Sequence, residues 1–84
     1  MDQELILYGT SGCHLCELAE EIIIPVALEA GLSLHPIDIA GNADLEARYE
    51  TSIPVLRRHD HELHWPFDTA AVVSLIAING PLKN

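Results

Sequence analysis

Basic residues are scarce in this sequence, which has 4 Lys and Arg against 13 Asp and Glu and a formal net charge of -9 at pH 7 with His neutral. A field of this sign repels phosphate backbones and anionic membrane surfaces. The one adjacent basic pair, Arg57 and Arg58, is too small to form a nucleic-acid footprint. We therefore expect no nucleic-acid partner.

A long apolar run is also absent. The longest one, Ile22 to Leu28, is far shorter than the roughly 20 residues that span a bilayer, so we expect no membrane partner. The opening residues, Met1 to Glu4, are acidic, whereas a secretory signal begins with positive charge. The expected location is the cytoplasm, a reducing compartment in which structural disulfides are rare.

Cysteine is equally rare, with 2 residues in the chain of 84. In a reducing compartment such a pair is more often catalytic or metal-binding than a structural cross-link. Apolar residues, by contrast, are plentiful at 49%, which is enough for one compact core. We therefore treat residues 1–84 as a single domain.

The apolar pattern and the turn residues predict an α/β domain with the element order β-α-β-α-β-β-α. The predicted strands are Glu4–Tyr8, Leu32–Ile39, Ile53–Arg57 and Glu62–Trp65, and the predicted helices run from near Cys13 to Gly31, from Ala43 to Glu50 and from Asp68 to near Asn79. Strands joined through helices pair in parallel, and the last two strands, joined by a turn at Asp60-His61, form an antiparallel hairpin. The result is a mixed four-stranded sheet covered by helices, the arrangement of the thioredoxin-like fold.

The first predicted helix is amphipathic, with apolar residues at three- and four-residue steps and acidic residues on its other side. The apolar residues are Leu15, Leu18, Ala19, Ile22, Ile23 and Val26, and the acidic residues are Glu17, Glu20, Glu21 and Glu29. Pro25 falls inside this helix, where its missing N–H costs about 3 kcal/mol, so we expect a kink or an early end there. Gly31 suits the C-cap, and Asn42 suits the N-cap of the second helix.

Cys13 and Cys16 stand at the start of the first predicted helix, a spacing that lets the two sulfurs approach each other across one turn. The helix N-terminus carries unpaired N–H groups and about half a positive charge, and Cys-x-x-Cys thiols in such positions have pKa values lowered from ~8.5 to roughly 3.5–7.5. We expect Cys13 to be the exposed attacking thiol and Cys16 the resolving thiol. A protonated His14 between them would stabilise the thiolate, while the acidic residues of the helix oppose it. A metal site and a pair of inert thiols are the alternatives at this point.

Three segments carry a pattern typical of one family: the first strand, Gly-Thr-Ser-Gly-Cys-His-Leu-Cys at residues 9–16, and Ser-Ile-Pro-Val at residues 52–55. This pattern resembles the glutaredoxin branch of the thioredoxin superfamily, and within it the small bacterial glutaredoxin-like proteins. The resemblance covers nearly the whole chain. It implies a thiol-disulfide oxidoreductase with a redox-active disulfide, no bound cofactor, and a protein disulfide or glutathione as redox partner.

The resemblance also implies roles for residues around the cysteine pair. Pro54 matches the position of a cis-proline, and the backbone of Ile53 before it pairs with the bound thiol substrate. Asp68 matches the residue that holds the amino group of glutathione. We count His14, between the two cysteines, among the substrate-contacting residues.

Three features depart from the glutaredoxin pattern at the glutathione groove. His14-Leu15 stands between the cysteines in place of a Pro-Tyr-like pair, Trp65-Pro66-Phe67 replaces a Gly-Gly turn before the last helix, and the loop Gly9–Gly12 has no basic residue. Glutathione is anionic, so a protein with a net charge of -9 is a poor host for it unless Arg48, Arg57 or Arg58 faces the groove. The use of glutathione is therefore doubtful.

Two other functions stay open. One is a non-catalytic binding module that holds a protein or glutathione in the groove beside Ile53-Pro54. The other is a zinc-binding protein in which hairpin histidines complete a site with the two cysteines, although a hairpin tip is more often a solvated polar turn. The residues of this second hypothesis are Cys13, Cys16, His59, His61 and His64. Trp65 and Phe67 either close the core beneath the last helix or form the wall of a substrate groove.

Overall fold

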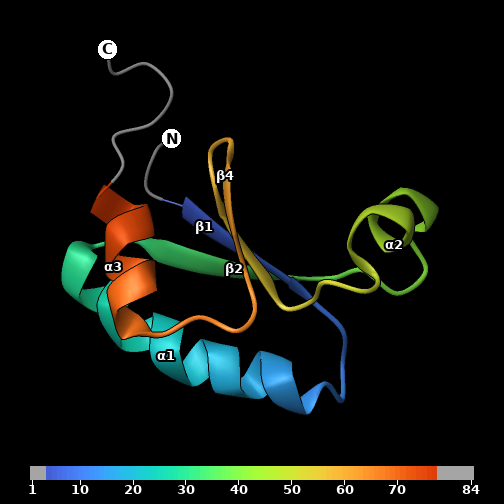
Figure 1. The fold of residues 1–84 in the computed structure, drawn as a ribbon, viewed down its shortest axis with the longest axis horizontal. Helices are drawn as coiled ribbons and strands as arrows, with labels where there is room; N and C mark the ends of the chain where they lie inside the picture. Colours follow the sequence, from blue (N-terminus) through green and yellow to red (C-terminus); the bar gives the residue numbers. More distant parts are fainter. Residues whose placement is uncertain (1–3, 78–84) are drawn as a thin grey trace.

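The computed structural model describes residues 4–77, and within them the predicted order of elements is confirmed (Figure 1). The strands are β1 (Glu4–Gly9), β2 (Ser33–Asp38), β3 (Val55–Arg58) and β4 (His61–His64), and the helices are α1 (His14–Ala30), α2 (Ala43–Tyr49) and α3 (Thr69–Ala77). The end of the last helix expected near Asn79 lies outside the described residues. Across residues 4–77, no helix combines the length and the apolar character needed to cross a membrane.

The four strands form one mixed sheet in the order β2-β1-β3-β4. Strand β1 runs parallel to β2, with Leu7 opposite Pro36, and antiparallel to β3, with Leu7 opposite Leu56. Strands β3 and β4 form the predicted antiparallel hairpin, with Leu56 opposite Leu63. The α/β, thioredoxin-like architecture is therefore confirmed, with β1 in the interior of the sheet.

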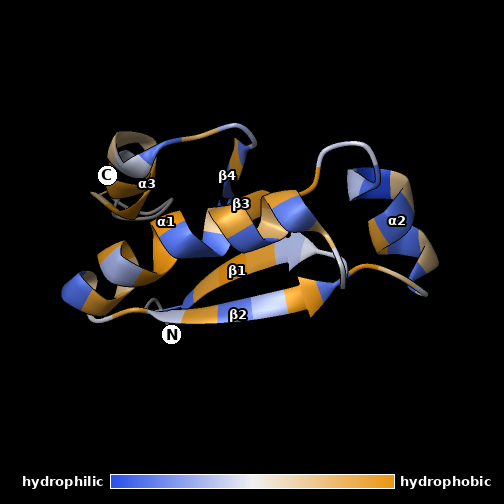
Figure 2. Ribbon diagram, turned by 90° about the horizontal axis from the view of Figure 1, so that it is seen from below, coloured by the Kyte–Doolittle hydropathy of each residue, from blue (hydrophilic) through white to orange (hydrophobic). Residues whose placement is uncertain are grey.

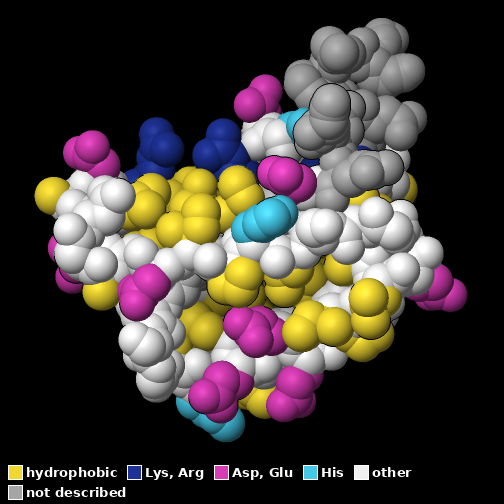
Figure 3. Space-filling view, turned by 180° about the vertical axis from the view of Figure 1, so that it is seen from behind, with side chains coloured by type: hydrophobic (Ala, Val, Ile, Leu, Met, Phe, Trp, Pro, Cys, Tyr) yellow, Lys and Arg dark blue, Asp and Glu magenta, His cyan; other side chains and the backbone are white. Residues whose placement is uncertain are grey.

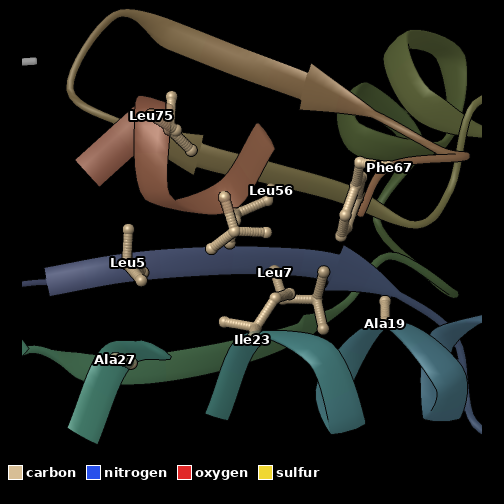
Figure 4. Packing of buried hydrophobic residues seen from close by; sticks show 9 residues of the cluster. Leu5, Leu7, Ala19, Ile23, Ala27, Leu56, Phe67 and Leu75 are labelled. Atoms are coloured by element: carbon tan, nitrogen blue, oxygen red, sulfur yellow. The ribbon is translucent and has the colours of Figure 1, made fainter. Parts of the chain in front are cut away.

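Helices α1 and α3 cover one face of the sheet, whereas α2 lies near one end of it (Figures 1 and 2). Because side chains alternate along a strand, Leu5 and Leu7 of β1 point to the same face, where they are 0% and 2% exposed. There they pack with Ala19 and Ile23 of α1, both 0% exposed (Figure 4). The same cluster includes Ala27, Leu56, Phe67, Val72 and Leu75. This packing holds α1 against β1 and fixes the start of α1 near the end of β1.

A smaller cluster of buried residues joins β1 and β3 to α2. It contains Tyr8, Ile39, Tyr49 and Val55. The rings of Tyr8 and Tyr49 stack with centroids 4.3 Å apart, and the Tyr49 hydroxyl donates a hydrogen bond of 2.6 Å to Glu62 Oε2. This hydrogen bond holds the pKa of Glu62 below its ordinary value, while burial and then the bond to Glu62 raise the pKa of Tyr49.

Tyr49→Phe is expected to lower the free energy of unfolding by about 1 kcal/mol at neutral pH, because it removes a hydrogen bond to a charged acceptor. The lowered pKa of Glu62 determines how the stabilisation by this hydrogen bond changes with pH. The stabilisation is present above the unfolded carboxyl pKa of ~4.3 and is lost as the pH falls through the lower folded value. Urea unfolding of both proteins at neutral pH and at about pH 2 to 3 measures this difference. An equal loss at the two pH values would contradict it.

Of the two outcomes expected at Pro25, a kink or an early end of the helix, the early end is wrong, because α1 continues through this residue. Pro25 is exposed, whereas Ile23 and Ala27 on either side of it are buried in the core. Their burial supports the helix across the position that lacks a backbone donor. The helix ends at Gly31 as expected, with a φ of 75° and its N–H directed to carbonyls of the last turn.

Pro25→Ala is therefore expected to raise the free energy of unfolding by about 2 kcal/mol. Alanine removes a penalty of about 3 kcal/mol in a helix interior, and the greater freedom of the unfolded chain offsets about 0.4–1 kcal/mol of this gain. Urea unfolding measures the change. Glu29→Ala, at another exposed position of α1, controls for helix propensity alone. A decrease in stability for Pro25→Ala would show that the helix needs the proline ring.

The hairpin turn lies one residue earlier than expected, at His59-Asp60 rather than at Asp60-His61, so β4 begins at His61. His59 has a φ of 56°, in the left-handed region for which glycine or asparagine is the usual signal. Histidine does not indicate a left-handed conformation, so the sequence pattern placed the turn one residue too late. Strand β3 likewise starts after Ile53-Pro54 rather than at Ile53, because proline has no N–H for the ladder.

Candidate active site

Cys13 is the N-cap residue of α1, with an extended backbone at φ -86° and ψ 110°. Its Sγ accepts a hydrogen bond from the backbone N–H of Cys16 at 3.1 Å. The sulfur thus occupies the position that a serine or aspartate oxygen takes in most N-caps. A thiolate on Cys13 would lie against a backbone donor and at the positive end of the helix dipole.

Cys13 and Cys16 are joined in a disulfide, with their Cα atoms 5.2 Å apart. The two partners differ in access to solvent. Cys13 is half-buried, whereas Cys16 is 7% exposed. Cys13 is therefore the member of the pair that an incoming sulfur can reach.

Gly9, the last residue of β1, makes room for Cys16. A Cβ atom at Gly9 would lie 2.7 Å from Cys16 Sγ and 3.4 Å from Cys16 Cβ. The first distance is too short for any side chain larger than that of glycine unless the sulfur moves. Gly9 is buried, and its carbonyl accepts the N–H of Ile39 at 2.9 Å. Nothing in the sequence pattern pointed to this role, because a glycine between a strand and a helix is typical of a loop.

Pro54 lies at the same end of the sheet as the disulfide. Tyr8 pairs with Val55 in the antiparallel β1–β3 ladder, so the next position along places Pro54 beside Gly9. The Pro54 carbonyl accepts the N–H of Trp65 at 3.3 Å, which brings the segment after β4 to this end as well. Three segments far apart in the sequence therefore meet beside the start of α1.

Two peptide bonds in these segments are cis, Ile53–Pro54 and Trp65–Pro66. The second had no signal in the sequence, because only about 5–6% of X-Pro bonds are cis in folded proteins. The N–H of Ile53 donates to the carbonyl of Tyr49 at 3.1 Å, and the Ile53 side chain is half-buried.

The two residues between the cysteines are exposed. The His14 side chain is 77% exposed, and its Nδ1 lies 4.0 Å from Glu17 Oε1. An ion pair this exposed contributes little to stability. Leu15 is 43% exposed and so presents apolar surface beside the disulfide.

Asp68 caps α3, and its Oδ1 accepts the N–H of Ala71 at 2.9 Å. It borders a pocket of about 410 Å³ that Pro66 and Phe67 also line. Phe67 is 8% exposed and belongs to the main core, and the Trp65 ring packs edge-on against it with centroids 5.0 Å apart. The two aromatic residues thus close the core beneath α3, while Phe67 also contributes to the pocket wall.

The hydrogen bonds of the two adjacent arginines go to the hairpin, to Tyr8 and to α3, not to the cysteine pair. Arg57 donates from Nε to the His59 carbonyl at 2.8 Å and from Nη1 to the Tyr8 hydroxyl at 3.4 Å. Arg58 donates to the carbonyl of Ile76 in α3. On the face of the molecule shown in Figure 3, the arginine side chains lie along the upper edge, whereas acidic side chains are spread over the face.

The zinc hypothesis finds no support in the part of the chain that the structure describes. His59 and His61 lie at the hairpin end of β3 and β4, and the register of β1 with β3 puts the disulfide at the other end. His64 pairs with Glu62, its Nε2 lying 3.2 Å from Oε1. Within residues 4–77, no group of three or more His, Cys, Asp and Glu side chains is placed to hold a metal ion.

The sheet order, the disulfide at the start of α1 and the proline segment beside it define a protein of the thioredoxin fold with a Cys-x-x-Cys site. Residues 4–77 match the profile of the Glutaredoxin-like domain (DUF836), and the chain belongs to this family. The family and the placement of the cysteine pair support chemistry of the thiol oxidoreductase type in general.

The solved structures similar to the chain include two of Northeast Structural Genomics target protein XcR50 from X. campestris. The X-ray structure has 37% sequence identity and a TM-score of 0.72, over 83% of this chain and 91% of that one. The solution structure has 35% identity and a TM-score of 0.68, over 83% and 87% of the two chains. No curated protein matches the chain.

Proposed function

We propose that the protein is a thiol-disulfide oxidoreductase in which Cys13 attacks the partner and Cys16 resolves the mixed disulfide. The observation that carries this proposal is the Cys13 sulfur at the N-cap of α1, bonded to the Cys16 N–H at 3.1 Å. The donor and the helix dipole stabilise negative charge on that sulfur both when it attacks and when it leaves.

The reaction in the reducing direction needs only the cysteine pair and a partner disulfide, R–S–S–R′. The Cys13 thiolate attacks one partner sulfur, a Cys13–S–R bond forms, and the R′ thiolate leaves and takes a proton from solvent. Cys16 then loses its proton and attacks Cys13 Sγ, the Cys13–S–R bond breaks, and the R thiolate leaves. Two electrons pass from the cysteine pair to the partner, and the pair ends as the disulfide.

A protein or peptide disulfide suits the surroundings of Cys13 better than glutathione does. Leu15 is exposed beside the disulfide, and Ile53 and Trp65 are half-buried at the same end of the sheet. These side chains offer apolar contact to a polypeptide. Glutathione carries carboxylates, which proteins usually bind with cationic side chains. Arg57 contacts His59 and Tyr8, Arg58 contacts α3, and Arg48 lies over the Tyr49 ring.

Four residues besides the cysteines are proposed to contact the substrate: His14, because it lies between the cysteines, and Ile53, Pro54 and Asp68, by analogy with the family. Because the Ile53 N–H already donates to the Tyr49 carbonyl, we assign backbone pairing with the substrate to the Ile53 carbonyl. Asp68 uses Oδ1 in the α3 cap, so its Oδ2 is the oxygen for a substrate amino group. The absence of a bound cofactor and the cytoplasmic location stay predictions.

A redox titration with thiol counting by mass tests the proposal. We expect a reversible two-electron couple in which both cysteines of the protein convert together between dithiol and disulfide. Failure to form the Cys13–Cys16 disulfide would rule out the proposed reaction and favour the binding-module hypothesis. Comparing turnover of a disulfide-bonded peptide with turnover of glutathione disulfide tests the substrate class, and faster turnover of glutathione disulfide would contradict it.

A further inference from the structure

A cavity of about 290 Å³ lies behind the disulfide, between α1 and the end of β2. Cys16 lines it together with Glu20, Asp38 and Ser11, so the buried cysteine shares this space with two carboxylates. A water molecule takes about 30 Å³ in the liquid, and the cavity has both the room and the polar partners to hold water. Among residues 4–77, no Lys, Arg or His lines it.

The two carboxylates of this cavity differ in their hydrogen-bond partners. Asp38 accepts the N–H of Ala40 on Oδ1 at 2.9 Å and the hydroxyl of Ser11 on Oδ2 at 3.4 Å. Glu20 is half-buried and has no hydrogen-bond or ion-pair partner among the described residues. It follows Cys16 by one turn of α1, a spacing that puts the two side chains on the same face of the helix. Glu20 is therefore the carboxylate available to accept a proton from a group that lines the cavity.

We infer that Glu20 accepts the proton of the Cys16 thiol, through water in this cavity, during the resolving step. This inference rests on the proposed function, because only a resolving thiol has to lose its proton there. Cys16 is 7% exposed, which limits its contact with bulk solvent. Glu20 lines the same cavity as Cys16, and a carboxylate can act as a general base through a bridging water.

The resolving step then balances without any further reactant. The S–H bond of Cys16 breaks, and its proton passes through water to the carboxylate of Glu20. The Cys16 sulfur forms a bond to Cys13 Sγ, the bond between Cys13 and the partner sulfur breaks, and the partner leaves as a thiolate. Glu20 afterwards returns the proton to solvent.

Simple charge repulsion predicts the opposite effect for Glu20. A carboxylate near a thiol disfavours the thiolate, and the same holds for Asp38 on β2 and for Glu17 and Glu21 on α1. If repulsion were its only effect, removal of the Glu20 charge would speed resolution. If Glu20 accepts the proton, its removal slows resolution, so the sign of the change separates the two roles.

The experiment compares Glu20→Gln with Glu21→Gln, which makes the same charge change at an exposed neighbouring position of α1. Each reduced protein is mixed with uncharged dithiodipyridine in a stopped-flow instrument. Attack by Cys13 releases the first equivalent of thiopyridone, and resolution by Cys16 releases the second. For Glu20→Gln we expect the second phase to slow by about tenfold or more at neutral pH, with little change in the first. For Glu21→Gln we expect neither phase to slow.

The pH dependence of the second-phase rate is a second measurement, and a purely structural role of Glu20 would leave it unchanged. The second-phase rate of the native protein should fall at acidic pH, and this fall should be lost in Glu20→Gln and retained in Glu20→Asp. A Glu20→Gln second phase that matches or exceeds the native rate across about pH 4–9 overturns the inference. If the native protein releases only one equivalent, the proposed function fails and this inference falls with it.

Discussion

Cys13→Ser is expected to abolish the reaction with a disulfide substrate, whereas Cys16→Ser is expected to stop it at the mixed disulfide. A serine hydroxyl at position 13 is not ionised at neutral pH and does not attack a disulfide, so the rate should fall by about a thousandfold or more. Cys16→Ser leaves the attacking sulfur in place but removes the sulfur that releases the partner.

The substitution at Cys13 is a mild one for the fold, which makes the result interpretable. The sulfur of Cys13 accepts the Cys16 N–H as the N-cap of α1, and serine is among the preferred N-cap residues. A serine hydroxyl can accept the same hydrogen bond, so α1 should still begin at His14. Circular dichroism and urea unfolding under reducing conditions should place Cys13→Ser close to the reduced native protein.

The measurement is mass spectrometry of each variant after reaction with a disulfide-bonded peptide. We expect a stoichiometric adduct on Cys13 of the Cys16→Ser protein and none on the Cys13→Ser protein. The reverse pattern, with the adduct on Cys16 alone, would show that the buried cysteine is the attacking one. That outcome would contradict the roles assigned from the 7% exposure of Cys16 and the cap position of Cys13.

The features that could be predicted from the sequence are those fixed by neighbours along the chain. Asn42 caps α2 through a hydrogen bond from the Leu45 N–H to its Oδ1 at 3.1 Å, as its residue type and position indicated. Gly31 ends α1 in the left-handed conformation, for the same kind of local reason. The start of α1 at the cysteine pair and the order of the elements follow from equally local patterns of period and turn.

The features that could not be predicted depend on contacts between distant segments. Pro25 is compatible with an unbroken helix because Ile23 and Ala27 are buried against the sheet, and no local rule reports that burial. The separation of the hairpin histidines from the cysteines follows from strand register. The cavity shared by Cys16, Glu20 and the end of β2 likewise exists only once α1 has packed on the sheet.

Gly9→Ala is the second change expected to have a large effect, because Gly9 carries no local signal and yet touches the site. The added methyl carbon would lie 2.7 Å from Cys16 Sγ, and in the oxidised protein the sulfur cannot move freely because it is tied to Cys13. Either α1 moves away from β1 or the Cys16 side chain rotates away from Cys13. Overpacking of this kind costs about 1–3 kcal/mol, and it should also slow closure of the disulfide.

Gly41→Ala is the matched control for this prediction. Gly41 has a φ of 84°, and a Cβ there would meet nothing within 4 Å, so alanine strains the backbone by about 1–2 kcal/mol without touching the cysteines. Urea unfolding should show both variants to be less stable than the native protein. Only Gly9→Ala should also slow the second phase of the dithiodipyridine reaction, because only there does the new methyl group displace the resolving sulfur. If both variants resolve at the native rate, the contact between Gly9 and Cys16 does not limit how the disulfide closes.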